Sequence, residues 1–145
     1  MQEFDYTVSL RIRHPSIDPQ VLTTMLGFSP QYSWRAGDRK PEGSGEAGSG
    51  TYRETYWLGR LPSAAAEAIP DLSLENAIMF ALLHIQRVDD LWRELIASGG
   101  SARIIVEVFG GRDVTLDLSP GTLSMLARFG VAISVDVHTE MQAVA

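Results

Sequence analysis

Two stretches that alternate strictly between apolar and polar residues constrain the fold of this chain more than any other feature. In residues 4–13 every even position is Phe, Tyr, Val, Leu or Ile, and in residues 131–138 every odd position is Val or Ile. Neighbouring side chains of a strand point to opposite faces, so this period predicts strands that are buried on one side only. Such strands are typical of a largely antiparallel sheet with a single covered face.

Three segments between these strands have the residue spacing of helices. Residues 18–27 and 119–130 each begin with a capping residue followed by proline and end at glycine, which predicts two short helices. Their similarity fits either an internal duplication or coincidence. Apolar residues three or four positions apart across residues 73–98 predict a long helix packed on one face of the sheet, with a kink at 87–90 left open.

The remaining strands are expected in two hairpins. Residues Gln31–Arg35 and Thr51–Leu61 are rich in aromatic and β-branched residues and flank a flexible, glycine-rich loop at 37–50. Residues Arg103–Phe109 and Val114–Leu118 flank a second turn, which contains two adjacent glycines. The predicted order of elements is therefore βαββαββαβ, an α+β fold whose first six elements follow the ferredoxin-like order.

Composition narrows the classes of protein to which the chain can belong. Its 145 residues suit a single domain over 1–145, and the lack of cysteine excludes thiol nucleophiles and disulfides and favours the cytoplasm. With 18 acidic and 12 basic residues the net charge is −6, which disfavours nucleic acid as a partner. The first residues lack the pattern of a secretory signal, and the longest apolar run, 77–83, is too short to span a membrane.

The glycine-rich loop contains the letters of a dinucleotide-binding motif without its context. Residues 43–48 read Gly-Ser-Gly-Glu-Ala-Gly, which satisfies G-x-G-x-x-G. That motif holds a pyrophosphate only where a strand enters the glycines and a helix leaves them. Residues 52–57, after the glycines, are typical of a strand instead, and no Gly-Lys-Ser/Thr ending supports a phosphate loop. We therefore predict no nucleotide and no other cofactor.

Aromatic and charged residues on both sides of this loop form a candidate binding surface for an acidic or aromatic partner. The alternative is that the loop is a soluble connection and that the tryptophans pack into the core. The residues of this candidate rim are Trp34, Arg35, Asp38, Arg39, Tyr52, Arg53 and Trp57.

A second candidate is a small polar cluster near the end of the chain. Asp136 and His138 share one face of the last strand, and His14 ends the first strand. If those strands are neighbours, the three side chains could hold a metal or act in general base chemistry. The alternative is a solvated strand face, which the alternation favours. No histidine pair has metal-ligand spacing, so we predict no metal site. We also predict no catalytic residue.

Several short motifs resemble those of a known family. They are the stretch from Tyr32 to Asp38, the pair at 56–57 that closes the glycine-rich loop, and the ending from Leu118 to Gly130 followed by residues 133–137. In these motifs the chain resembles the bacterial domain of unknown function family 4279, with His138 where an aromatic residue is expected. The resemblance implies a small, cytosolic, single-domain α+β protein and carries no established activity.

Two hypotheses about function follow. The first is an interaction module that binds a protein, either a second copy or another chain, for example as the immunity partner of a toxin, through an exposed patch near the glycine-rich hairpin. The second is a small-ligand-binding protein or weak enzyme with a pocket between the sheet and the long helix. Polar groups from Trp34, Arg35, Asp38 or Asp136 would then converge on that pocket.

Overall fold

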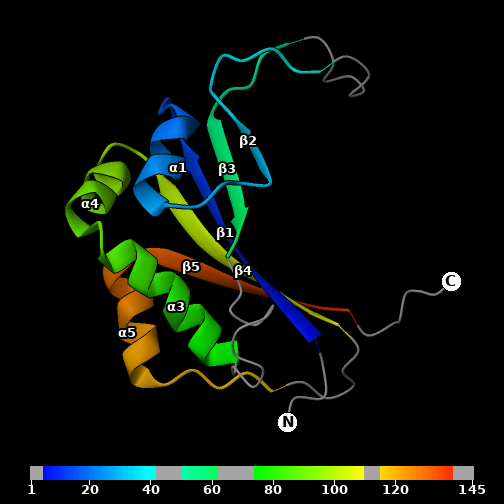
Figure 1. Ribbon diagram of the computed structural model, residues 1–145, viewed down its shortest axis with the longest axis vertical. Helices are drawn as coiled ribbons and strands as arrows, with labels where there is room; N and C mark the ends of the chain where they lie inside the picture. Colours follow the sequence, from blue (N-terminus) through cyan, green and yellow to red (C-terminus); the bar gives the residue numbers. More distant parts are fainter. Residues whose placement is uncertain (1–4, 42–49, 62–73, 110–114, 139–145) are drawn as a thin grey trace, which may run out of the picture.

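The computed structural model describes residues 5–41, 50–61, 74–109 and 115–138. Figure 1 shows a sheet with its helices gathered on one side. The elements in chain order are β1 (Asp5–His14), α1 (Pro19–Leu26), β2 (Tyr32–Trp34), β3 (Thr55–Arg60), α3 (Leu74–Gln86), α4 (Asp89–Ala97), β4 (Ser101–Phe109), α5 (Pro120–Phe129) and β5 (Val131–His138).

The sheet has five strands in the order β2-β3-β1-β4-β5. The pairs β2/β3, β1/β3 and β1/β4 are antiparallel, whereas β4 and β5 are parallel. Buried side chains alternate along β1, β3 and β4, so one face of the sheet lies on the core, and the opposite, outer face carries none of the helices that the structure describes. The expected α+β class, the largely antiparallel sheet and the hairpin of β2 with β3 are confirmed.

The second predicted hairpin is wrong. Residues 115–118 of the expected strand Val114–Leu118 form an irregular connection, and Val114 lies outside the described residues. Leu116 and Leu118 are half-buried and pack against the core, so their alternation serves burial without any neighbouring strand. The chain then passes through α5 and returns as β5, which is parallel to β4. A tight turn would make the two strands antiparallel, whereas a helical crossover lets the second strand run in the same direction as the first.

The expected long helix is divided in two. It is interrupted at 87–88, where Val88 leaves the helical conformation with φ −120° and ψ 39°. Asp89 and Asp90 then occupy the first turn of α4, where the helix dipole favours negative charge. A single helix over 73–98 is therefore wrong, and the interruption falls where the sequence left a kink open. Figure 1 shows that α3 and α4 run in different directions.

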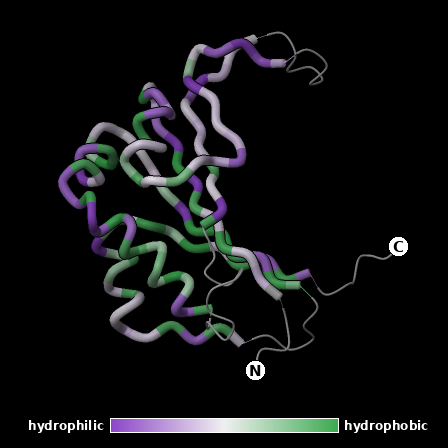
Figure 2. The backbone as a smooth tube through the Cα atoms, viewed as in Figure 1, coloured by the Kyte–Doolittle hydropathy of each residue, from purple (hydrophilic) through white to green (hydrophobic). Residues whose placement is uncertain are grey.

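The core fills the space between the sheet and the helices. Trp57, Ile78 and Ile104, from β3, α3 and β4, have no exposed surface. Side chains therefore fill the interface between α3 and the sheet at these positions. Figure 2 shows hydrophobic residues recurring along the strands and helices, while the segments that lead to the glycine-rich loop are hydrophilic. In the part of the chain that the structure describes, each helix is too short or too polar to cross a bilayer.

Candidate functional site

Three aromatic rings beside the glycine-rich loop stack on one another. Trp34 lies opposite Tyr56 in the β2/β3 register, with ring centroids 4.5 Å apart, and stacks at 4.2 Å on Tyr52. Lys40 Nζ lies 5.7 Å from the centroid of Tyr52, and the Arg13 guanidinium lies 5.8 Å from that of Tyr56. The ring faces of this aromatic stack are therefore covered by one another and by the two cations. The stack connects the segments on either side of the loop.

The other exposed rim residues make contacts of their own beside this stack. The Arg35 guanidinium lies 3.6 Å from Asp18, and Asp38 Oδ2 accepts a hydrogen bond from the Arg35 backbone N–H at 2.8 Å. Arg39 pairs with Thr51 in an isolated bridge, and Arg53 is exposed.

Trp57 cannot belong to a binding surface. Alternation along β3 turns it to the face opposite Tyr56, where it is fully buried in the core. Its place in the candidate rim is therefore wrong, and the alternative of a core tryptophan holds at this position.

The proposed polar cluster does not form. His14 lies on the core face of β1, while Asp136 and His138 are exposed on β5, and β4 lies between these two strands. The His138 ring instead stacks on Phe109 with centroids 4.6 Å apart. Among the described residues no group of three His, Asp or Glu side chains could hold a metal ion.

His14 joins the end of β1 to the end of α4. Its Nδ1 accepts hydrogen bonds from the backbone N–H groups of Ser16 and Ile17, at 3.0 and 2.9 Å. The hydrogen of the neutral ring must then be on Nε2, which donates to Ser98 Oγ at 2.8 Å, and that hydroxyl donates to the Glu94 carbonyl. His14 is thus a buried structural connector that uses both ring nitrogens.

This arrangement predicts that the protein loses stability as pH falls. Burial lowers the pKa of His14 below its ordinary value of 6.5. As pH falls, His14 therefore takes up a proton at a higher pH in the unfolded chain than in the folded protein. The contribution of neutral His14 to stability is complete above about pH 6.5 and is lost as pH falls through the lower folded-state pKa. Urea unfolding at about pH 7.5 and about pH 5 measures this loss.

The control for this prediction is His14→Asn, which keeps an acceptor near the two backbone N–H groups and cannot titrate. We expect its unfolding midpoint to change less between the two pH values than that of the parent protein. Equal changes in both proteins would contradict the assignment to His14.

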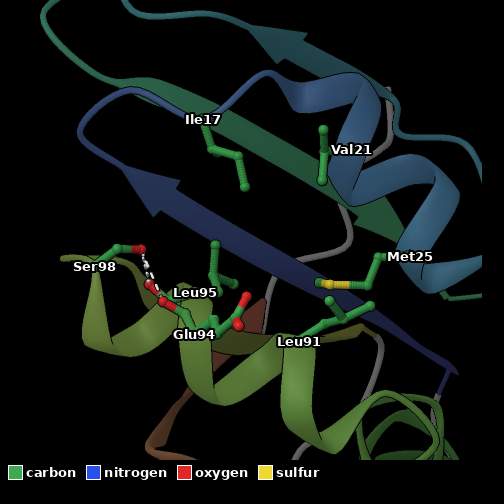
Figure 3. Close-up of a pocket in the computed structure, with 7 residues that line it drawn as sticks. All are labelled: Ile17, Val21, Met25, Leu91, Glu94, Leu95 and Ser98. Atoms are coloured by element: carbon green, nitrogen blue, oxygen red, sulfur yellow. Dashed lines mark hydrogen bonds between the residues drawn. The ribbon is translucent and has the colours of Figure 1, made fainter.

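An apolar groove runs between α1 and α4. It has a volume of about 160 Å³ and continues over α1 into a hollow of about 330 Å³ that shares three of its residues. Figure 3 shows its side chains pointing toward one another from the two sides. The residues that line the first part are Ile17, Val21, Met25, Leu91, Glu94, Leu95 and Ser98.

The two helices expose this α1–α4 groove because each carries a second apolar row. Leu22 and Leu26 of α1 are buried, so Val21 and Met25, one position earlier, face sideways toward α4. Leu91 precedes the buried Trp92 in the same way. Val21 remains 49% exposed and Leu91 52% exposed. The sequence pattern predicts one apolar stripe on α1, but it does not show which part of that stripe stays exposed once the core is filled.

One protein family matches nearly the whole chain. The match covers residues 4–140, and the family is described as a domain of unknown function, DUF4279. No curated protein and no solved structure matches the chain.

Proposed function

Because the chain belongs to the DUF4279 family, whose description names no activity, we propose from its geometry that it is a non-catalytic interaction module. In this proposal the α1–α4 groove receives an amphipathic, basic helix of another protein. The observation that carries the proposal is the pair Val21 and Leu91, half-exposed on the two sides of an apolar groove. Contiguous exposed apolar surface of this kind is typical of protein interaction sites.

The dimensions of the groove suit a short helical segment. α1 has eight residues and α4 has nine, so the walls are about 12–14 Å long at the helical rise per residue. Such a length accommodates about two turns of a partner helix, with apolar side chains at positions i, i+3 or i+4, and i+7. Met25 suits this role because its flexible side chain adapts to different surfaces.

Charge favours a basic partner over a second copy of this chain. Glu94 lines the groove, and its carboxylate has no hydrogen-bond or ion-pair partner in the described part of the chain. Asp18 lines the adjoining hollow, next to Arg35. A second copy would bring a molecule of net charge −6 to the Glu94 carboxylate, whereas basic side chains would be attracted to it.

We propose two further features at the same level. The order β2-β3-β1-β4, with α1 between β1 and β2, supports a ferredoxin-like unit that α5 and β5 extend. The absence of cysteine from all 145 residues supports work in the cytoplasm.

Photocrosslinking in the cells that make the protein tests the interaction. A photoreactive phenylalanine at position 91 should yield a discrete adduct, and the crosslinked peptide should be an apolar and basic segment of another protein. Val21→Lys places a positive charge in the apolar groove and should abolish this adduct, because the partner's apolar and basic side chains would then both meet that charge.

The matched control is the same photoreactive residue at position 123 of α5. Leu123 is 50% exposed, so it equals Leu91 in character and exposure but lies on another helix. It should give no such adduct. Identical adducts from both positions, adducts with a second copy only, or none from position 91 would contradict the proposal.

A further inference from the structure

Three arginines line a polar hollow on the outer face of the sheet. Arg11 and Arg13 come from β1 and Arg103 from β4, and Arg11 lies directly opposite Arg103 in the β1/β4 register. The hollow has a volume of about 290 Å³ and is completed by Ser101, Gly130 and Ala132 among others. This feature lies apart from the α1–α4 groove and does not depend on the function proposed there.

The charges of these arginines are poorly matched by the protein itself. Arg13 Nε lies 3.7 Å from Glu54, at the margin of the cluster. Arg103 Nη1 donates to the neutral Ser134 Oγ at 2.6 Å. The Arg11 guanidinium has no hydrogen bond or ion pair in the part of the chain that the structure describes. Like charges directly opposite one another in a sheet are destabilising, so the pair Arg11 and Arg103 costs stability unless an anion lies between them.

Two acidic residues of the same face, Glu107 and Asp136, lie away from the cluster. Glu107 follows Arg103 by four positions along β4, which is about 13 Å in a strand, and Asp136 lies beside Glu107 on β5. The chain has 18 acidic residues, yet only Glu54 forms an ion pair with one of the three arginines among the described residues. The positive end of this face is therefore available to an external anion.

We propose that this hollow, the arginine hollow, binds a small oxyanion, a carboxylate or a phosphate group. The guanidinium group is a planar fork that can donate two parallel hydrogen bonds to either group. Arg103 is held by Ser134 and Arg13 by Tyr56 and Glu54, which limits the conformational entropy that binding would remove. Of the three arginines, Arg11 is the one whose side chain would have to be ordered when the anion binds.

A small anion fits better than a nucleic acid strand. Proteins that hold single strands stack successive bases on free aromatic faces. The aromatic stack next to Arg13 has its faces engaged by one another, by Lys40 and by Arg13 itself. The surroundings of the hollow therefore supply charge and hydrogen-bond donors without a platform for bases.

Titration of the purified protein with inorganic phosphate and, separately, with citrate tests the proposal, with sodium chloride at matched ionic strength as reference. At least one anion should give saturable changes in the NMR signals of the Arg11 and Arg103 side chains, and the two titrations distinguish phosphate from carboxylate. Arg11→Gln and Arg103→Gln should each weaken the binding by roughly tenfold or more, because each removes charge-assisted hydrogen bonds.

The matched control is Arg60→Gln. Arg60 lies on the same face of the sheet, opposite Ser9 in the β1/β3 register, but does not line the hollow. It should leave the affinity unchanged. If Arg103→Gln fails to fold after losing its bond to Ser134, Arg11→Gln still decides the question. Shifts that only follow ionic strength, or equal weakening by Arg60→Gln, would overturn the proposal.

Discussion

Replacing Trp57 with alanine is expected to lower the free energy of unfolding by about 3–5 kcal/mol, the range for large core aromatic residues. The side chain is fully buried, packs edge-on against Phe28 with ring centroids 5.4 Å apart, and donates from Nε1 to Thr23 Oγ1 at 3.0 Å. Truncation would leave a cavity between β3 and α1, and the Thr23 hydroxyl would lose the N–H group that donates to it. Urea unfolding followed by circular dichroism measures the change.

Two variants act as controls for this prediction. Trp57→Phe keeps a ring in the core and loses the N–H donor, so its cost should be clearly smaller. Trp34→Ala removes a tryptophan that is only half-buried, on the outer face of the sheet, and should also cost less than Trp57→Ala. If the two alanine variants were equally stable, Trp57 would not be the core tryptophan that the structure shows.

Replacing Thr55 with valine should cost about 2–4 kcal/mol, although the two side chains have nearly the same shape. Thr55 Oγ1 accepts from the Ala36 N–H at 3.0 Å and donates to the Ile17 carbonyl at 2.6 Å, in a position without exposed surface. Valine would leave both backbone groups without their partner, and an unpaired buried polar group costs about 1–3 kcal/mol.

Thr55→Ser separates this loss from a packing effect. Serine keeps the hydroxyl and removes one methyl group, so its cost should be about 1 kcal/mol. Thermal unfolding of the three proteins compares them directly. A serine variant that is as unstable as the valine variant would mean that the methyl group, and not the pair of hydrogen bonds, accounts for the stabilisation.

Local sequence signals predicted the elements that depend on local chemistry. The helix α1 begins after Asp18, whose carboxylate accepts from the Gln20 N–H, and ends at Gly27 with φ 86°. The helix α5 likewise begins after Ser119 and ends at Gly130 with φ 67°. Capping hydrogen bonds and left-handed glycines involve residues within one turn of the helix end, so the sequence contains them fully.

Features that depend on distant partners were not predictable in this way. Alternation at 115–118 resembles a strand, but a strand also needs a neighbour with free hydrogen-bonding groups. The interruption at 87–88 lies in a segment with continuous helical periodicity, and only the two acidic residues that follow Val88 hint at a new helix start. The parallel pairing of β5 follows from the crossover through α5 and not from the residues of β5 itself.

The two candidate sites were missed for the same reason. Val21 and Met25 belong to the apolar stripe of α1, and periodicity alone does not separate core positions from those left exposed. Arg11 and Arg13 stand at the polar positions of a half-buried strand, and only the β1/β4 register brings Arg103 beside them. The rim hypothesis, in contrast, identified rings that do meet, Trp34 and Tyr52, but counted Trp57 on the wrong face.

The most direct test of groove binding is a charge exchange between the two partners. The dissociation constant of the crosslinked partner segment would be measured for the parent protein and for Glu94→Lys, each with the natural segment and with one whose basic residues are changed to glutamate. The groove proposal predicts that Glu94→Lys weakens binding of the natural segment and restores binding of the acidic one. If Glu94→Lys affected both segments equally or not at all, the partner would not lie in the α1–α4 groove.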